Sequence, residues 1–146
     1  MTVNTDTYEV TVDQYGSTPI KEYVTGRTVE VSVPMAETTI ENLVRIMPGA
    51  TLITDSAEDT KMYVNVPSAA GLDLLDFAKP LVLHPMSNDE TDKSDDFTVF
   101  KAATPGALDY QYTLDNERIF NCTFKAYPDS ENGNQLFAIG DTTATA

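Results

Sequence analysis

The sequence predicts a mainly β domain with a single α-helix, and three observations lead to that prediction. Short segments alternate between apolar and polar residues, which is the period of a strand with one buried face. Gly, Pro, Asn and Asp residues separate these segments and favour turns. Only residues 38–47 repeat their apolar positions at helical spacing, so we expect one helix and otherwise strands.

Length and composition are those of an ordinary globular domain. Of the 146 residues, 41% are hydrophobic and 22% are charged, which favours a single domain over residues 1–146. The apolar runs are short, so we expect no membrane-spanning helix. Met1 is not followed by basic residues and then an apolar stretch, so we expect no secretory signal. The single cysteine, Cys122, excludes an internal disulfide framework and is predicted to be a small core residue.

The charge narrows the range of functions. Nine Lys and Arg residues against 23 Asp and Glu residues give a net charge of −14. Such a surface is poorly suited to holding nucleic acid, because affinity for phosphates comes largely from Lys and Arg. The acidity either serves solubility alone, or it repels a polyanion or meets a basic partner.

The first predicted strand covers residues 7–13, where Tyr8, Val10 and Val12 alternate with polar residues. A connection over residues 14–24 follows, and it is longer than a usual hairpin loop. Its two tyrosines either contact a partner or fold back over the rim of the core.

The second strand and the helix form the best-marked unit of the chain. Valines alternate with polar residues over residues 28–33, and Pro34 ends the pairing. The helix is expected over residues 38–47, with a capping box formed by Thr38 and Glu41. The apolar stripe that packs this helix on the core is predicted to be Ile40, Leu43, Val44 and Met47.

Shorter strands are expected in the second half of the chain. They cover residues 51–54, 61–66, 79–84, 97–101, 110–114, 118–127 and 135–139. Residues 72–77 fit either a turn of helix or a strand. Asn132 and Gly133 predict a hairpin turn that pairs the last two strands directly. Residues 141–146 are small and polar, and we expect them to fray.

No catalytic constellation can be assembled from these residues, so we predict that the chain is not an enzyme and uses no cofactor or metal. Phosphate-binding glycine loops and nucleophile elbows are absent. A glycosidase-like carboxylate pair is not excluded, but there is no tryptophan to stack on a sugar. His84 has no neighbouring His or Cys to complete a metal set, so we expect it at a solvated rim. The acidic run at residues 87–96 lacks EF-hand spacing and is expected to be a mobile loop, with adventitious cation binding as the alternative.

Several passages, and their order along the chain, resemble a known family. The most specific are VDQYGSTP at residues 12–19 and VPMAETTIENLVRIMPGA at residues 33–50. Similar passages are KPLVLHP at residues 79–85, TPGAL at residues 104–108 and FKAYPD at residues 124–129. In these passages the chain resembles the major tail tube proteins of long, non-contractile-tailed bacteriophages. The resemblance covers nearly the whole chain, although family members usually carry a further segment before the first strand recognised here.

This resemblance implies an antiparallel β-sandwich or partial barrel with one flanking α-helix. It also implies a structural virion protein that self-assembles into stacked hexameric rings and forms the tail tube, a conduit for genome ejection. Its partners would be other copies of itself, the tape-measure protein, the tail terminator and distal tail proteins. DNA would pass without specific binding, no membrane anchor would be used, and the protein would reach the virion after assembly in the host cytoplasm. The alternative is a monomeric, acidic β-sandwich binding module.

The family's residue roles carry over only at matching positions. The connection at residues 14–24 matches the loop that reaches an adjoining ring, and its contact candidates are Tyr15, Ile20, Lys21 and Tyr23. The first two strands match the pair that lines the lumen. Their polar side chains are therefore expected to face an acidic channel, namely Glu9, Thr11, Glu30 and Ser32, while the helix covers Tyr8, Val10, Val29 and Val31.

Overall fold

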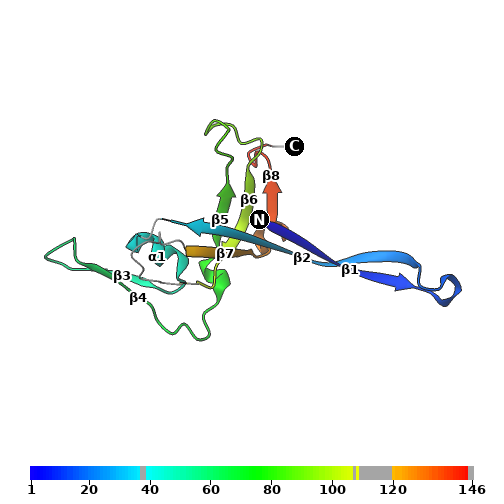
Figure 1. The fold of residues 1–146 in the computed structure, drawn as a ribbon, viewed down its shortest axis with the longest axis horizontal. Helices are drawn as coiled ribbons and strands as arrows, with labels where there is room; N and C mark the ends of the chain where they lie inside the picture. The colour runs from blue at the N-terminus through cyan, green and yellow to red at the C-terminus, as the bar shows by residue number, and fades with distance from the viewer. Residues whose placement is uncertain (37–38, 107, 109–119, 145–146) are drawn as a thin grey trace, which may run out of the picture.

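A computed structural model of the chain describes residues 1–36, 39–106, 108 and 120–144. It is mainly β, with antiparallel pairing throughout its two sheets and one α-helix beside them, which confirms the predicted fold class (Figure 1). The elements are β1 (Thr2–Thr11), η1 (Asp13–Tyr15), β2 (Pro19–Met35), α1 (Ile40–Ile46), β3 (Thr51–Thr54), β4 (Met62–Asn65), η2 (Leu74–Phe77), β5 (Lys79–Leu83), β6 (Phe97–Ala103), β7 (Phe120–Ala126), η3 (Ser130–Asn132) and β8 (Phe137–Ile139).

The larger sheet has the strand order β1-β2-β7-β6-β5, and β8 also pairs with β6. The smaller sheet consists of β3 and β4, which lie beside α1 (Figure 1). Strand β2 belongs to two environments, because its first part pairs only with β1 and its last part, from Glu30 to Met35, pairs with β7. The strand therefore connects a projecting hairpin to the packed part of the chain. We call this packed part, formed by the end of β2 with β5, β6, β7, β8 and α1, the body.

The core lies where β2, β6 and β7 meet. One cluster of buried side chains contains Val31, Phe97, Val99 and Ala102, with Phe137 stacked on Phe97 at a ring-centroid distance of 4.9 Å. A second cluster joins Ile46 of α1 to Cys122 of β7. Cys122 is only 1% exposed, which confirms the prediction of a core cysteine, and burial raises the pKa of its thiol.

The helix is shorter than predicted, and its N-cap lies one residue later than the predicted cap. Thr39, not Thr38, is the N-cap, since its Oγ1 accepts a hydrogen bond from the Asn42 amide at 3.3 Å. Thr38 lies outside the described residues. The predicted stripe also omits the one buried helix residue, Ile46, which is 3% exposed. Leu43 and Met47 pack against the Ile46 cluster, whereas Ile40 and Val44 are half-buried.

The predicted direct pairing of the last two strands is wrong. Strand β8 pairs with β6, through Phe137–Val99 to Ile139–Phe97, and not with β7. The physical reason is that β7 pairs with only two residues of β6, Ala102 and Ala103, which leaves the start of β6 open to β8. Gly133 still supplies the turn, at a φ of 71° after η3.

Most of the remaining predicted strands form close to their expected positions. Residues 72–77, which fitted two structures, contain the 3₁₀ helix η2. The predicted strand at residues 110–114 lies outside the described residues, as do residues 118–119 of the strand expected at 118–127. At the end of the chain, residues 141–144 form a turn in which the Asp141 carboxylate accepts a hydrogen bond from the Thr143 amide at 2.9 Å.

Candidate assembly surface

A two-stranded hairpin projects from the body and has no layer of the described chain packed on either face. We call residues 4–28 the hairpin arm (Figure 1). None of its residues is buried, and only Val10 and Gly26 are even half-buried. Its exposed large apolar side chains are Tyr8, Val12, Tyr15, Ile20, Tyr23 and Val24. An isolated two-stranded hairpin is marginally stable in water, so this surface favours a partner.

The predicted long loop over residues 14–24 is wrong, because most of it is strand. Residues 12–18 make the turn, including η1, and β2 begins at Pro19. Of the predicted contact residues, only Tyr15 lies at the tip, where it is 63% exposed. Ile20, Lys21 and Tyr23 lie on the flank of the arm. All four are exposed, and their role between rings stays a prediction.

The strand register separates the four residues that were expected to face one channel. Glu30 pairs with Thr2, while Glu9 pairs with Glu22. Successive residues of a strand alternate between faces, so Thr2 and Glu9, seven positions apart on a strand without an inserted residue, lie on opposite faces. Glu30 and Ser32 therefore share one face, and Glu9 and Thr11 lie on the opposite face.

The register of β1 on β2 causes this separation, because Thr2, the partner of Glu30, lies an odd number of positions from Glu9. Strand β2 also contains one extra residue. The partners step from Gly26 for Asp6 to Val24 for Thr7, which leaves Thr25 as a bulge that shifts the alternation of β2. Tyr8 lies five positions from Val3, the partner of Val29, and therefore on the opposite face of the sheet. It is 62% exposed rather than packed under the helix. Val29 and Val31 are buried as expected, but Val31 packs against Phe97, Val99 and Ala102 of β6 rather than under the helix.

Charges on the arm are arranged unfavourably for a free subunit. Glu9 and Glu22 stand directly opposite each other, and like charges in such a pair destabilise a hairpin. Lys21 lies on the other face, with its ammonium 4.7 Å from the centre of the Tyr23 ring. At the base, by contrast, Glu30 forms an ion pair with Lys125 at 3.6 Å. The distal end of the arm thus carries the Glu9–Glu22 pair, while Arg27, on the same face, pairs with Thr5 nearer the base.

A second hairpin, β3–β4, projects in another direction and also exposes apolar side chains. Leu52, Ile53 and Tyr63 are all exposed on its strands. The whole chain exposes 10915 Å². A compact monomer of 16.0 kDa would expose about 7,400 Å², so roughly 3,500 Å² is in excess. The outer edge of β1 adds backbone groups that pair with no described strand.

The acidic segment at residues 87–96 is held by side-chain hydrogen bonds near both of its ends, and one of them involves His84. The ring Nδ1 of His84 lies 2.5 Å from Oδ1 of the buried Asp96. This hydrogen bond raises the pKa of His84, and the Asp96 and Asp92 charges and the Asn88 backbone add to the rise against partial desolvation. Asn88 in turn donates to Asp95 at 3.1 Å. His84 is therefore a half-buried structural residue rather than a solvated one.

Nothing in the described residues assembles a metal site of three or more His, Cys, Asp or Glu side chains. The described helices are also all too short or too polar to cross a membrane. Comparison with family models, with curated proteins and with solved structures yields no match.

Proposed function

We propose that this chain is a self-assembling structural subunit of the tail tube of a long, non-contractile-tailed bacteriophage, with six copies in a ring and the rings stacked. The observation that carries the proposal is the hairpin arm, which is ordered as two paired strands and yet exposes both faces and one edge. The proposal of a tail tube in particular rests on the passages that resemble the tail tube family.

Assembly resolves three unfavourable features of the free subunit. Pairing with a neighbouring sheet would satisfy the open edge of β1, and closing a ring would leave no edge at all. Contacts between copies would bury the exposed tyrosines of the arm. The excess of roughly 3,500 Å² per subunit is large enough for several interfaces of standard size.

The charge distribution supports a conduit rather than a DNA-binding protein. A net charge of −14 leaves few cations to hold phosphates, so DNA would pass without being retained. We keep the lumen proposal for Glu30 and Ser32, which share the polar face of the sheet with Lys125 and Thr123. Glu9 and Thr11 would meet a different neighbour, because they lie on the opposite face.

Electron microscopy of the purified chain tests this proposal. At high concentration we expect negatively stained images to show rings and hollow tubes. Replacing both Tyr8 and Tyr23 by Ser should abolish them without loss of fold, because these paired, exposed side chains do not support the core. A matched variant, Tyr63→Ser in the second hairpin, shows whether the rings and tubes depend on that hairpin as well. Wild-type protein that stays monomeric would contradict the proposal and favour the monomeric binding module.

A further inference from the structure

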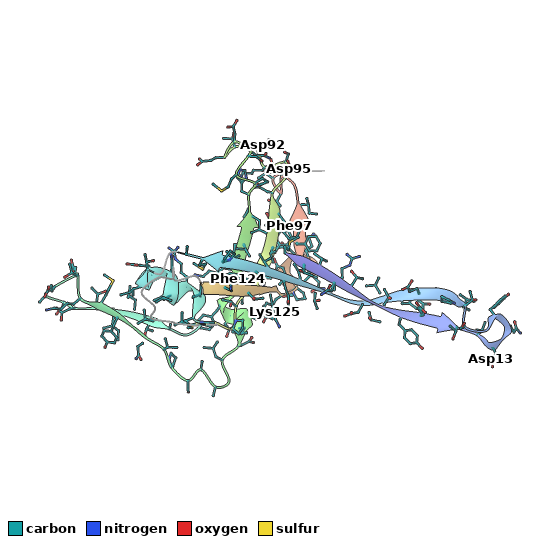
Figure 2. All side chains as sticks on the ribbon, in the orientation of Figure 1. Asp13, Asp92, Asp95, Phe97, Phe124 and Lys125 are labelled. Atoms are coloured by element: carbon teal, nitrogen blue, oxygen red, sulfur yellow. The ribbon has the colours of Figure 1, made fainter. Side chains whose placement is uncertain are left out.

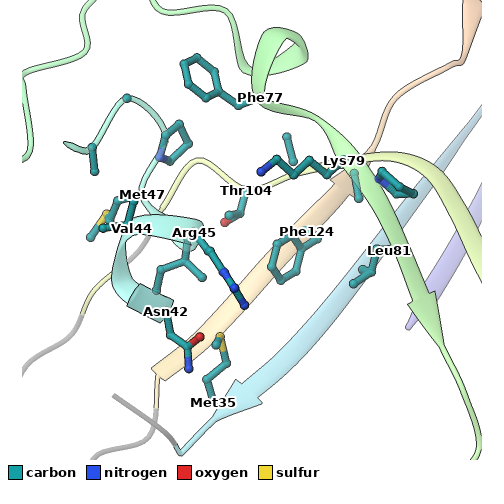
Figure 3. Close-up of a pocket in the computed structure, with 17 residues that line it drawn as sticks. Met35, Asn42, Val44, Arg45, Met47, Phe77, Lys79, Leu81, Thr104 and Phe124 are labelled. Carbon is teal, nitrogen blue, oxygen red and sulfur yellow. The ribbon is translucent and has the colours of Figure 1, made fainter. Parts of the chain in front are cut away.

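A groove between α1 and the body is built for an acidic, partly apolar occupant. Its volume is about 670 Å³, and its 17 described lining residues come from β2, α1, η2, β5, β6, β7 and the adjoining loops (Figure 3). Met47, Phe77, Leu81 and Phe124 give it apolar walls. Phe77 remains 43% exposed, so this apolar surface is open to a ligand.

The groove is lined by positive charges, whereas the chain as a whole is negatively charged. None of its 17 described lining residues is Asp or Glu, although the chain has 23 of these residues. Arg45 and Lys79 both line it, and Figure 3 shows the Arg45 side chain between α1 and Phe124 and Lys79 on the β5 side of the pocket. Within the described part of the chain neither cation forms an ion pair. The groove thus presents two uncompensated cations beside an apolar surface.

The tip of the hairpin arm has the complementary chemistry. Asp13 lies at its far end (Figure 2), between the exposed apolar side chains of Val12 and Tyr15. The Glu9–Glu22 pair lies just behind the tip and increases its negative charge. We propose that this tip, residues 12–15, docks in the groove of a second copy, with the Asp13 carboxylate accepting hydrogen bonds from Arg45 and Lys79.

A chain cannot dock its own tip in this way. The tip adjoins Pro19 at one end of β2, and the groove begins at Met35 at the other end. Sixteen steps along an extended strand separate the two by roughly 50 Å. A contact between opposite ends of two copies is head-to-tail, and repeating it closes a ring or extends a filament. This inference rests on the proposed function, since it names the partner surface of the arm.

Disulfide trapping between two separately purified variants tests the contact. One variant carries Gln14→Cys at the tip, and the other carries Val44→Cys in the groove. Because Cys122 is 1% exposed, it contributes little background. After mixing and mild oxidation we expect a cross-linked dimer of the two variants. The control pairs Gln14→Cys with Ala57→Cys, an exposed position between β3 and β4, and should give little product.

Charge reversal sharpens the test. Adding Asp13→Lys to the Gln14→Cys variant should reduce cross-linking to Val44→Cys by about tenfold or more, as expected for a lost charge-assisted hydrogen bond. The matched control, Asp59→Lys, changes the net charge equally at an exposed site outside the arm and should have little effect. Equal effects of the two reversals would overturn the Asp13 contact.

The outcomes separate this inference from the proposed function. Rings and tubes without cross-linking above the Ala57→Cys control would overturn the docking of the tip and leave the tube proposal standing. That result would also leave the groove to a different acidic ligand or protein. Cross-linked dimers that never assemble into rings or tubes would support the docking and contradict the tube proposal.

Discussion

The body and the hairpin arm differ sharply although one strand, β2, runs through both. Val31, in the part of β2 that pairs with β7, is 3% exposed, whereas Tyr23, in the part that pairs only with β1, is 49% exposed. Backbone hydrogen bonds continue along the whole strand, but burial stops near Val29. The body is therefore stabilised by its own core. The arm is held by strand pairing alone, and its side chains remain exposed.

The same substitution in the two regions should give the largest contrast. Ile46→Ala removes a side chain that is 3% exposed and packs against Cys122, so we expect a loss of about 2–5 kcal/mol in the free energy of unfolding. Ile20→Ala, on the exposed arm, should change it by less than about 0.5 kcal/mol. Denaturant unfolding of the unassembled chain measures both. Equal losses would show that the arm is part of the core.

Removing a buried carboxylate should lower stability more than removing an exposed one. The difference should be smaller than that between the two isoleucine substitutions. Asp129 is buried and accepts hydrogen bonds from Lys101 Nζ at 3.0 Å and from Asn132 Nδ2 at 2.7 Å. Asp129→Ala leaves these donors without their acceptor and should lower the urea midpoint clearly. Asp13→Ala, at the tip of the arm, should leave the midpoint unchanged. A reversed order of the two midpoints would contradict the division into body and arm.

The body should also carry a pH dependence that the arm lacks. The hydrogen bond that the Asp96 carboxylate accepts from His84 raises the pKa of His84 above its ordinary value near 6.5. This contribution to stability is therefore complete below about pH 6.5 and is lost as the pH rises through the folded pKa. We expect a higher melting temperature at pH 6 than at pH 8.5, and a flatter profile in His84→Gln. An unchanged profile in that variant would exclude the pair as the cause.

The smallest effect is expected at the base of the arm, where the two regions meet. Glu30 and Lys125 form an ion pair at 3.6 Å, and both side chains are about half exposed. Such exposed pairs contribute less than about 1 kcal/mol and are screened by salt. A double-mutant cycle with Glu30→Gln and Lys125→Met measures the coupling. A value of several kcal/mol would mean that the junction is more rigid than an exposed pair allows.

Sequence alternation predicted the type and approximate position of most described strands, because buried valines and phenylalanines repeat with the period of a strand. It did not predict register. The bulge at Thr25 and the pairing of β8 with β6 depend on contacts between distant segments, which no local pattern records. The same limit explains why Ile46 was missed, since only the position of Cys122 shows which side of the helix faces the core.

The candidate surface was predicted in part. Of the two alternatives for Tyr15, folding back over the rim of the core is wrong, because Tyr15 is exposed at the tip of the arm. Its contact with another copy stays a prediction. The groove was not predicted, since it brings Arg45 and Lys79 together from segments more than thirty positions apart.

Sedimentation velocity of the intact chain, over a wide range of protein concentration, tests the central claim most directly. The account predicts a species of about six times 16.0 kDa and larger multiples of it at high concentration. The Tyr8→Ser, Tyr23→Ser double variant should sediment as a folded monomer under the same conditions. A wild-type chain that sediments only as a 16.0 kDa monomer at every concentration would contradict the claim that the hairpin arm is an assembly surface.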